Sequence, residues 1–227
     1  MQIENLGHWV EDYFYMSRGH TLALLNFKPP AHYLGHVQAN KVPIVLLPGV
    51  YTRWHFLKSI ADPLSKAGHP IYVLEHLGYN FKEIDKTAKL VSEFIDAKRL
   101  TNVILLAHSK GGLIGKYLLA FHNHDHKIKK LIAVASPFGG SNLVRFFKFG
   151  TLAELSPSSS VVKKLQEYNH ANKDIVSIFG IFDNHVWPED SCKLPGAKNI
   201  QVSIHGHHKI LFDNQIKKIV MGEIEAV

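Results

Sequence analysis

The sequence of 227 residues predicts an α/β protein with a mostly parallel β-sheet and helices on both faces. Short unbroken apolar runs, such as residues 43–47 and 103–107, are typical of strands buried on both faces. These runs alternate with segments, such as residues 113–121, in which apolar residues recur at helical spacing. Repeated alternation of the two patterns indicates a parallel sheet whose strands are connected by helices.

The composition favours one domain over residues 1–227 with a sizeable core, since 46% of the residues are hydrophobic and 20% are charged. The single cysteine, Cys192, excludes an intramolecular disulfide and is compatible with a reducing compartment. The formal charge of +7 comes from scattered lysines without a nucleic-acid-binding motif, so we expect no nucleic-acid partner. The 16 histidines lack metal-ligand spacing, and we predict no metal site.

The first residues lack the basic and apolar regions of a signal peptide, and no apolar run is long enough to span a membrane. We therefore expect a cytoplasmic protein without a transmembrane segment, which is compatible with transient contact with a lipid surface. The sequence predicts no oligomeric state.

The amino-terminal region is predicted to hold a short amphipathic helix within residues 1–19, followed by two strands. The strands cover residues 21–27 and 32–37, and the prolines between them cannot continue a ladder. We expect an antiparallel pair at one edge of the sheet.

The middle of the chain continues with a strand at 43–47 and a helix at 53–67, which we expect to break or kink at Asp62-Pro63. A buried strand follows at 71–75. Asn80-Phe81-Lys82-Glu83 has the pattern of a capping box that opens the next helix.

After a further strand at 129–135, the alternation stops in residues 142–171, which we interpret as a small cap inserted over the carboxyl ends of the strands. Strands resume at 174–182 and 199–205, and a helix at 210–220 closes the chain. Active sites of such sheets lie beyond the carboxyl ends of the strands.

One of these strand ends, within residues 101–121, turns abruptly into a helix, with Ser109 at the turn. Small neighbours let strand and helix pass closely, and such a turn holds its central residue in a strained, exposed conformation. A serine there faces the unpaired amides at the start of the helix, as a nucleophile beside an oxyanion site would. A plain turn of small residues is the alternative, but the flanking strand and helix favour catalysis.

The segment Ala107-His108-Ser109-Lys110-Gly111-Gly112 resembles the nucleophile elbow of α/β-hydrolase-fold lipases and esterases, with Ala107 in place of the usual first glycine. The resemblance covers about residues 42–220. It implies the α/β-hydrolase fold, no cofactor, and catalytic residues that follow one another as serine, acid and histidine.

The catalytic acid implied by this resemblance is Asp183, which directly follows the strand at 174–182 and precedes Val186 by three residues, as in the acid loop of lipases. Glu189 and Asp190 lie deeper in the same loop and are better explained as surface carboxylates.

The catalytic base implied by the resemblance is His207, because Gly206-His207 and the aliphatic residues after it match the family's spacing. His208 is its nearest competitor, and His205 is assigned to the strand. One of two neighbouring loop histidines is expected to meet both Ser109 and the acid.

The oxyanion donors implied by the resemblance are the backbone amides of Val50 and Lys110, although Pro48 departs from the family's pattern in the first loop. Substrate contacts are assigned to five aromatic residues near the strand ends: Tyr51, Phe138, Phe146, Phe147 and Phe149.

The sequence therefore predicts a serine hydrolase that cleaves a small-molecule or lipid ester through an acyl-enzyme on Ser109. Acyl transfer and thioester hydrolysis would use the same residues and remain open. A non-catalytic binding protein of the same fold is the alternative from another functional class.

Overall fold

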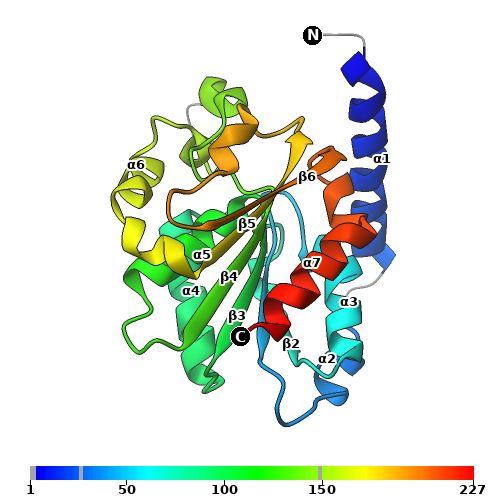
Figure 1. Ribbon diagram of the computed structural model, residues 1–227, viewed down its shortest axis with the longest axis vertical. Coiled ribbons are helices and arrows are strands. Elements are labelled where there is room, and N and C mark those ends of the chain that lie inside the picture. Colours follow the sequence, from blue (N-terminus) through cyan, green and yellow to red (C-terminus); the bar gives the residue numbers. More distant parts are fainter. Residues whose placement is uncertain (1–3, 26–27, 148–149) are drawn as a thin grey trace.

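A six-stranded, all-parallel β-sheet forms the centre of the protein (Figure 1). The computed structural model describes residues 4–25, 28–147 and 150–227. The strand order is β2-β1-β3-β4-β5-β6, which confirms the predicted parallel sheet. The strands are β1 (Ile44–Leu47), β2 (Ile71–Tyr72), β3 (Val103–His108), β4 (Ile128–Val134), β5 (Ile175–Phe182) and β6 (Lys198–His205).

Helices cover both faces of the sheet because successive strand residues point to opposite faces and both sets are apolar. Leu105 belongs to the core cluster that contains residues of α4, α5 and α6, whereas its neighbour Leu106 belongs to the cluster that contains residues of α2, α3 and α7. In Figure 1 the two groups of helices lie on opposite sides of the sheet. The helices are α2 (His32–Gly35), α3 (Lys58–Lys66), α4 (Ile84–Ala97), α5 (Lys110–Phe121), α6 (Ser160–Glu167) and α7 (Asn214–Glu225).

Several 3₁₀ turns complete the chain between these elements. They are η1 (Trp54–Leu57), η2 (Glu75–Leu77), η3 (Asn142–Phe146), η4 (Ala153–Leu155), η5 (Asn169–Asp174), η6 (Glu189–Cys192) and η7 (Lys209–Phe212).

The helix predicted near the amino terminus is present, but the two strands predicted after it were wrong. One helix, α1 (Glu4–Leu25), runs through most of the first predicted strand, and the second predicted strand is the short helix α2. Residues 26 and 27 lie outside the described residues. The helix continues because it packs against η1 and η7, with Ala23 buried, so tertiary contacts outweigh the strand propensity of residues 21–25.

Three local predictions in the middle of the chain also need correction. Pro63 lies inside α3, whose buried Ile60 and Leu64 hold the helix in place despite a proline cost of about 3 kcal/mol. The strand predicted at 71–75 is reduced to β2, two residues long, and η2 follows it. The predicted capping box is not formed, since α4 begins at Ile84 and the side chain of Asn80 bonds elsewhere.

None of the helices in the described ranges is long and apolar enough to cross a membrane.

Candidate active site

Ser109 lies at the sharp turn between β3 and α5, as predicted. Its backbone has φ 53° and ψ −123°, a strained combination for a residue with a side chain. The Ser109 amide donates to the Val134 carbonyl of β4 at 3.0 Å, and the Ser109 carbonyl accepts from Gly112 at 3.0 Å. The turn is thus fixed on both sides of the serine.

Glycines after the serine allow α5 to approach the sheet. A Cβ atom on Gly111 would lie 2.0 Å from the carbonyl oxygen of Leu47 in β1, and one on Gly112 would lie 2.2 Å from Ser136 Oγ. Real Cβ atoms do not approach other atoms so closely. The small residues predicted at the elbow are therefore needed for packing of α5 on β1 and β4.

The turn after β1 passes directly beside Ser109. A Cβ atom on Gly49 would lie 3.0 Å from the Ser109 Cβ atom. Thr52 Oγ1 donates to the Gly49 carbonyl at 3.0 Å. Val50 follows Gly49 and lines the same cavity as Ser109, at the edge where the strand order reverses between β1 and β3.

Asp183 and His207 form a buried pair at the carboxyl ends of β5 and β6. His207 Nδ1 lies 2.8 Å from Asp183 Oδ2, and both side chains are almost fully buried. Asp183 Oδ1 accepts the amides of His185 at 2.7 Å and Val186 at 2.9 Å. With Nδ1–H donated to Asp183, Nε2 of His207 carries the free lone pair.

Removal of this pair from water shifts both of its pKa values. Burial, together with the nearby His208, lowers the pKa of His207 to about 3. Burial also acts to raise the pKa of Asp183, whereas the amides of His185 and Val186 act in the opposite direction. The His207 imidazole is therefore neutral near pH 7, the state in which it can accept a proton.

The competing residues named from the sequence have other partners. Asp190 forms an exposed ion pair with Lys193 at 2.7 Å, and Glu189 shares the η6 turn with it. His205 stacks on His8 of α1 with ring centroids 3.9 Å apart. His208 has a carboxylate partner of its own, Asp12, at 3.0 Å.

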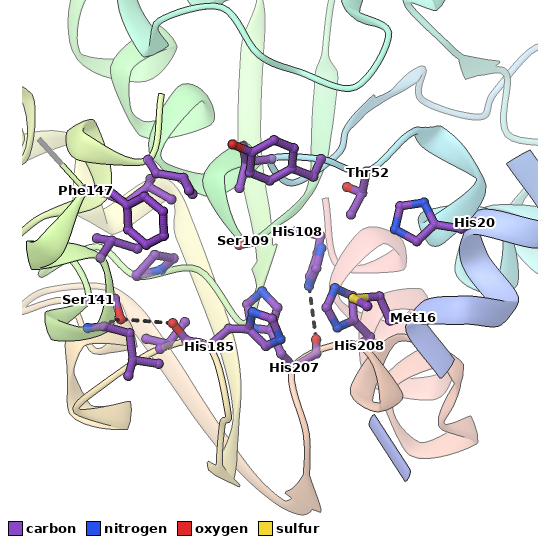
Figure 2. A pocket seen from close by; sticks show the side chains of 18 residues that line it. Met16, His20, Thr52, His108, Ser109, Ser141, Phe147, His185, His207 and His208 are labelled. Carbon is purple, nitrogen blue, oxygen red and sulfur yellow. Dashed lines mark hydrogen bonds between the residues drawn. The ribbon is translucent and has the colours of Figure 1, made fainter. Parts of the chain in front are cut away.

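A cavity of about 290 Å³ joins Ser109 and His207 (Figure 2). Within the described residues no hydrogen bond links the Ser109 hydroxyl to His207. Nine apolar side chains line the cavity: Met16, Val50, Pro137, Leu143, Val144, Phe147, Leu152, Leu155 and Val186.

Of the five aromatic residues assigned to substrate contact, Tyr51 and Phe147 line this cavity. Phe138 and Phe146 are not among the residues that line it. Phe138 is 2% exposed and belongs to the core cluster that contains residues of α5. Phe146 is 76% exposed with the Arg145 guanidinium over its ring. Phe149 lies outside the described residues.

The side chain of Lys110 is buried beside the elbow, although only its amide was assigned a role from the sequence. Its Nζ donates to the carbonyls of Asn80 and Lys82 and to Thr151 Oγ1. Burial lowers the pKa of Lys110 to about 8. The start of α5 is thereby tied both to the segment before α4 and to residues 142–171.

Sequence reasoning missed the contribution of α1 and of further histidines. Met16 and His20 of α1 and His108, His185 and His208 line the cavity. His108 Nε2 lies 3.1 Å from the His207 carbonyl oxygen, which accepts its proton. The spacing of Met16 and His20 on one helical face was readable, but nothing in the sequence linked that face to residues two hundred positions away.

Asp12, His185 and His208 form a group that could hold a metal ion. One ligand atom of each residue lies within 4.8 Å of the ligand atoms of the other two. The sequence could not show this group because its members are far apart in the chain. In the structure the carboxylate oxygens of Asp12 already accept hydrogen bonds from His208 and Lys209, so two members of the group are partners of each other.

Comparison with known proteins places this fold in a family. The model of the alpha/beta hydrolase fold matches residues 42–155. A curated protein named "Putative esterase/lipase 3", from Mycoplasma pneumoniae, is 29% identical over 113 residues, which are 48% of this chain and 41% of that protein. The chain thus spans less than half of the length of this relative.

Solved structures with the same architecture include two lipases. Aspergillus fumigatus lipase B superposes with a TM-score of 0.68 at 17% identity, over 87% of this chain and 55% of that chain. The mature Bacillus licheniformis lipase BlEst2 gives 0.64 at 17% identity, over 84% of this chain and 95% of that chain. At such identities the likeness shows the fold alone, but the family model covers half of the chain. The chain belongs to the alpha/beta hydrolase fold family and is similar to its lipases and esterases.

Proposed function

We propose that this protein is a serine hydrolase that cleaves carboxylic esters through an acyl-enzyme on Ser109. One observation carries the proposal: the strained Ser109 at the end of β3 shares a cavity with His207, which is paired with Asp183. The names of the similar lipases and esterases support the reaction class.

Acylation would begin when the substrate carbonyl enters the cavity and Ser109 approaches His207. Nε2 of His207 takes the hydroxyl proton while Ser109 Oγ forms a bond to the carbonyl carbon. The oxyanion would accept hydrogen bonds from the amides of Val50 and Lys110, the second being unpaired at the start of α5. Collapse of the tetrahedral intermediate breaks the bond to the alcohol oxygen, which receives the proton from His207.

Deacylation repeats the sequence with water. His207 removes a proton from water as the water oxygen attacks the acyl carbon. The bond between the acyl carbon and Ser109 Oγ then breaks. The serine recovers its proton and the carboxylic acid leaves. Asp183 keeps Nδ1 protonated and the ring oriented throughout.

The substrate proposed for this site has an apolar acyl or alcohol group, because the cavity wall is formed by aliphatic and aromatic side chains. Five of them, Leu143, Val144, Phe147, Leu152 and Leu155, belong to residues 142–171. This supports the interpretation of that segment as a cap over the site, within a single domain.

The test is reaction of the purified protein with a fluorophosphonate probe and with nitrophenyl esters of graded chain length. The parent should be labelled on Ser109 and should hydrolyse the esters, whereas Ser109→Ala should lose about a millionfold in turnover. Circular dichroism should show that the variant remains folded. A parent without labelling or turnover would contradict the proposal and favour a binding protein. Addition of alcohol acceptors or thioesters separates the alternatives of acyl transfer and thioester hydrolysis.

A further inference from the structure

We infer that α1 contributes a positioning residue to the active site. Asp12 of this helix holds the catalytic loop 206–209 in place by binding the residues that directly follow His207. This inference rests on the proposed function, because positioning has a meaning only if His207 is the base.

The Asp12 carboxylate is fully buried, and its hydrogen bonds are made with this loop. Oδ1 accepts the backbone amides of His208 at 2.6 Å and Lys209 at 2.8 Å. Oδ2 lies 3.0 Å from Nδ1 of His208. An ionised carboxylate that accepts backbone amides forms strong, short hydrogen bonds, and it leaves the loop few alternative conformations.

The loop is shaped to receive this carboxylate. A Cβ atom on Gly206 would lie 2.6 Å from Asp12 Oδ1, and Gly206 has φ 111°, a conformation that favours glycine. His207 therefore lies between two residues that Asp12 contacts or constrains. Its own amide donates to Asn184 Oδ1 at 3.0 Å and its carbonyl accepts from His108. The backbone around the base is fixed from three elements of the fold.

The same face of α1 forms part of the cavity wall. Asp12, Met16 and His20 follow one another at four-residue intervals and therefore lie on one side of the helix. Met16 and His20 line the cavity, and Figure 2 shows both on the side of the cavity formed by α1. Asp12 thus fixes the helix that closes this side of the site and the loop that carries the base at the same time.

The negative charge of Asp12 also affects the pKa of His207. Burial acts to raise the pKa of Asp12, but the hydrogen bond and charge of His208 and the Lys209 amide bring it below its usual value, so the carboxylate stays ionised. This anion raises the pKa of His207, against the larger lowering by burial. The titratable groups that face His207 are Asp183, His185, His108, His208 and Asp12.

A matched control lies one residue away on the same helix. Glu11 pairs with Lys209 Nζ at 2.7 Å, but this pair is partly exposed. Exposed ion pairs contribute about 0–1 kcal/mol. Glu11→Gln and Asp12→Asn therefore remove the same charge from the same helix, while only the second loosens the backbone after His207.

The experiment measures kcat, KM and the pH dependence of ester hydrolysis for the parent, Asp12→Asn and Glu11→Gln. In Asp12→Asn we expect kcat and kcat/KM to fall together by about a hundredfold, the usual cost of a small displacement of a catalytic group. The acid limb of the profile should move to lower pH, because loss of an anion lowers the pKa of His207. Glu11→Gln should stay close to the parent.

The inference is overturned if Asp12→Asn behaves like Glu11→Gln, or if it changes only KM. If Asp12→Asn loses the circular dichroism of the parent, Asp12→Ala is assayed with and without acetate, and recovery of activity with acetate supports the inference while no recovery overturns it. A parent that neither hydrolyses esters nor reacts with fluorophosphonate would instead contradict the proposed function.

Discussion

Asn80 donates a hydrogen bond from Nδ2 to the carbonyl oxygen of Pro48 at 2.7 Å, across 32 residues of chain. Pro48 starts the turn that carries Val50. The Asn80 carbonyl in turn accepts a hydrogen bond from Nζ of Lys110 at 3.0 Å. One buried asparagine thus connects the two segments whose amides are the proposed oxyanion donors.

Asn80→Gly should lower kcat without unfolding the protein. Glycine is the suitable replacement because Asn80 has φ 55°, so the change removes the side chain and keeps the backbone conformation. Loss of one oxyanion donor costs about 10²–10³ in kcat, and we expect a loss at or below the lower figure because the donor is displaced and not removed. Asn123→Ala is the control, since Asn123 bonds Ile128 far from the cavity. Equal kinetic losses in both variants would sink the idea.

His207→Ala should reduce ester hydrolysis to near the uncatalysed level, whereas His208→Ala should keep a measurable part of the activity. His207 alone is paired with Asp183, and His208 is held by Asp12. Turnover and fluorophosphonate labelling of both variants provide the measurement. The assignment fails if His208→Ala loses the activity and His207→Ala retains it.

The acid limb of the pH profile should lie well below the value of about 6.5 expected for an unperturbed histidine. Burial lowers the pKa of His207, and a base is active above its pKa, so hydrolysis should persist as the pH falls from 7 through 6. We would measure kcat/KM from pH 4 to 9 in buffers of constant ionic strength. A midpoint near 6.5 would show that pairing with Asp183 outweighs burial.

Gly111→Ala should destabilise the protein by several kcal/mol, since its Cβ atom would overlap the Leu47 carbonyl of β1, which cannot move aside as a side chain can. Gly222→Ala in α7 is the matched control. No atom lies within 4 Å of a Cβ there, and alanine in a helix is more stable than glycine by about 0.5–1 kcal/mol. Urea unfolding of both variants checks that the two changes have opposite signs.

Phe147→Ala should reduce turnover of long-chain nitrophenyl esters more than that of acetate esters, because Phe147 lines the cavity. Phe146→Ala is the control, since the neighbouring ring is exposed and does not line the cavity. An equal loss on short and long esters in Phe147→Ala would indicate general destabilisation.

The parallel sheet could be predicted because its strands are buried on both faces and read as unbroken apolar runs. The run before Ser109 defines β3 and the run before Pro48 defines β1. The prediction of amino-terminal strands was wrong because the apolar residues within 21–25 recur without a clear period. Packing of this segment on η1 and η7 favours the helix. The capping box failed for a similar reason, since the Asn80 side chain finds a stronger partner in the Pro48 carbonyl.

Part of the candidate site was likewise readable from local patterns. Ser109, Asp183 and His207 each follow a strand, and the structure brings Asp183 and His207 together. Their catalytic roles stay predictions. Asp12 could not be found, because a single carboxylate in a helix has no local signal, and its partners are visible only once the fold is known.

The contact between Asp12 and His208 joins groups 196 residues apart in the chain. Closing so long a loop costs entropy that only the folded remainder can offset, so contacts of this kind form late in folding. The protein should consequently form its secondary structure before its active site becomes reactive. During refolding from urea, the helical signal should return ahead of the reactivity of Ser109, and the delay measures how long the two distant parts of the chain take to meet.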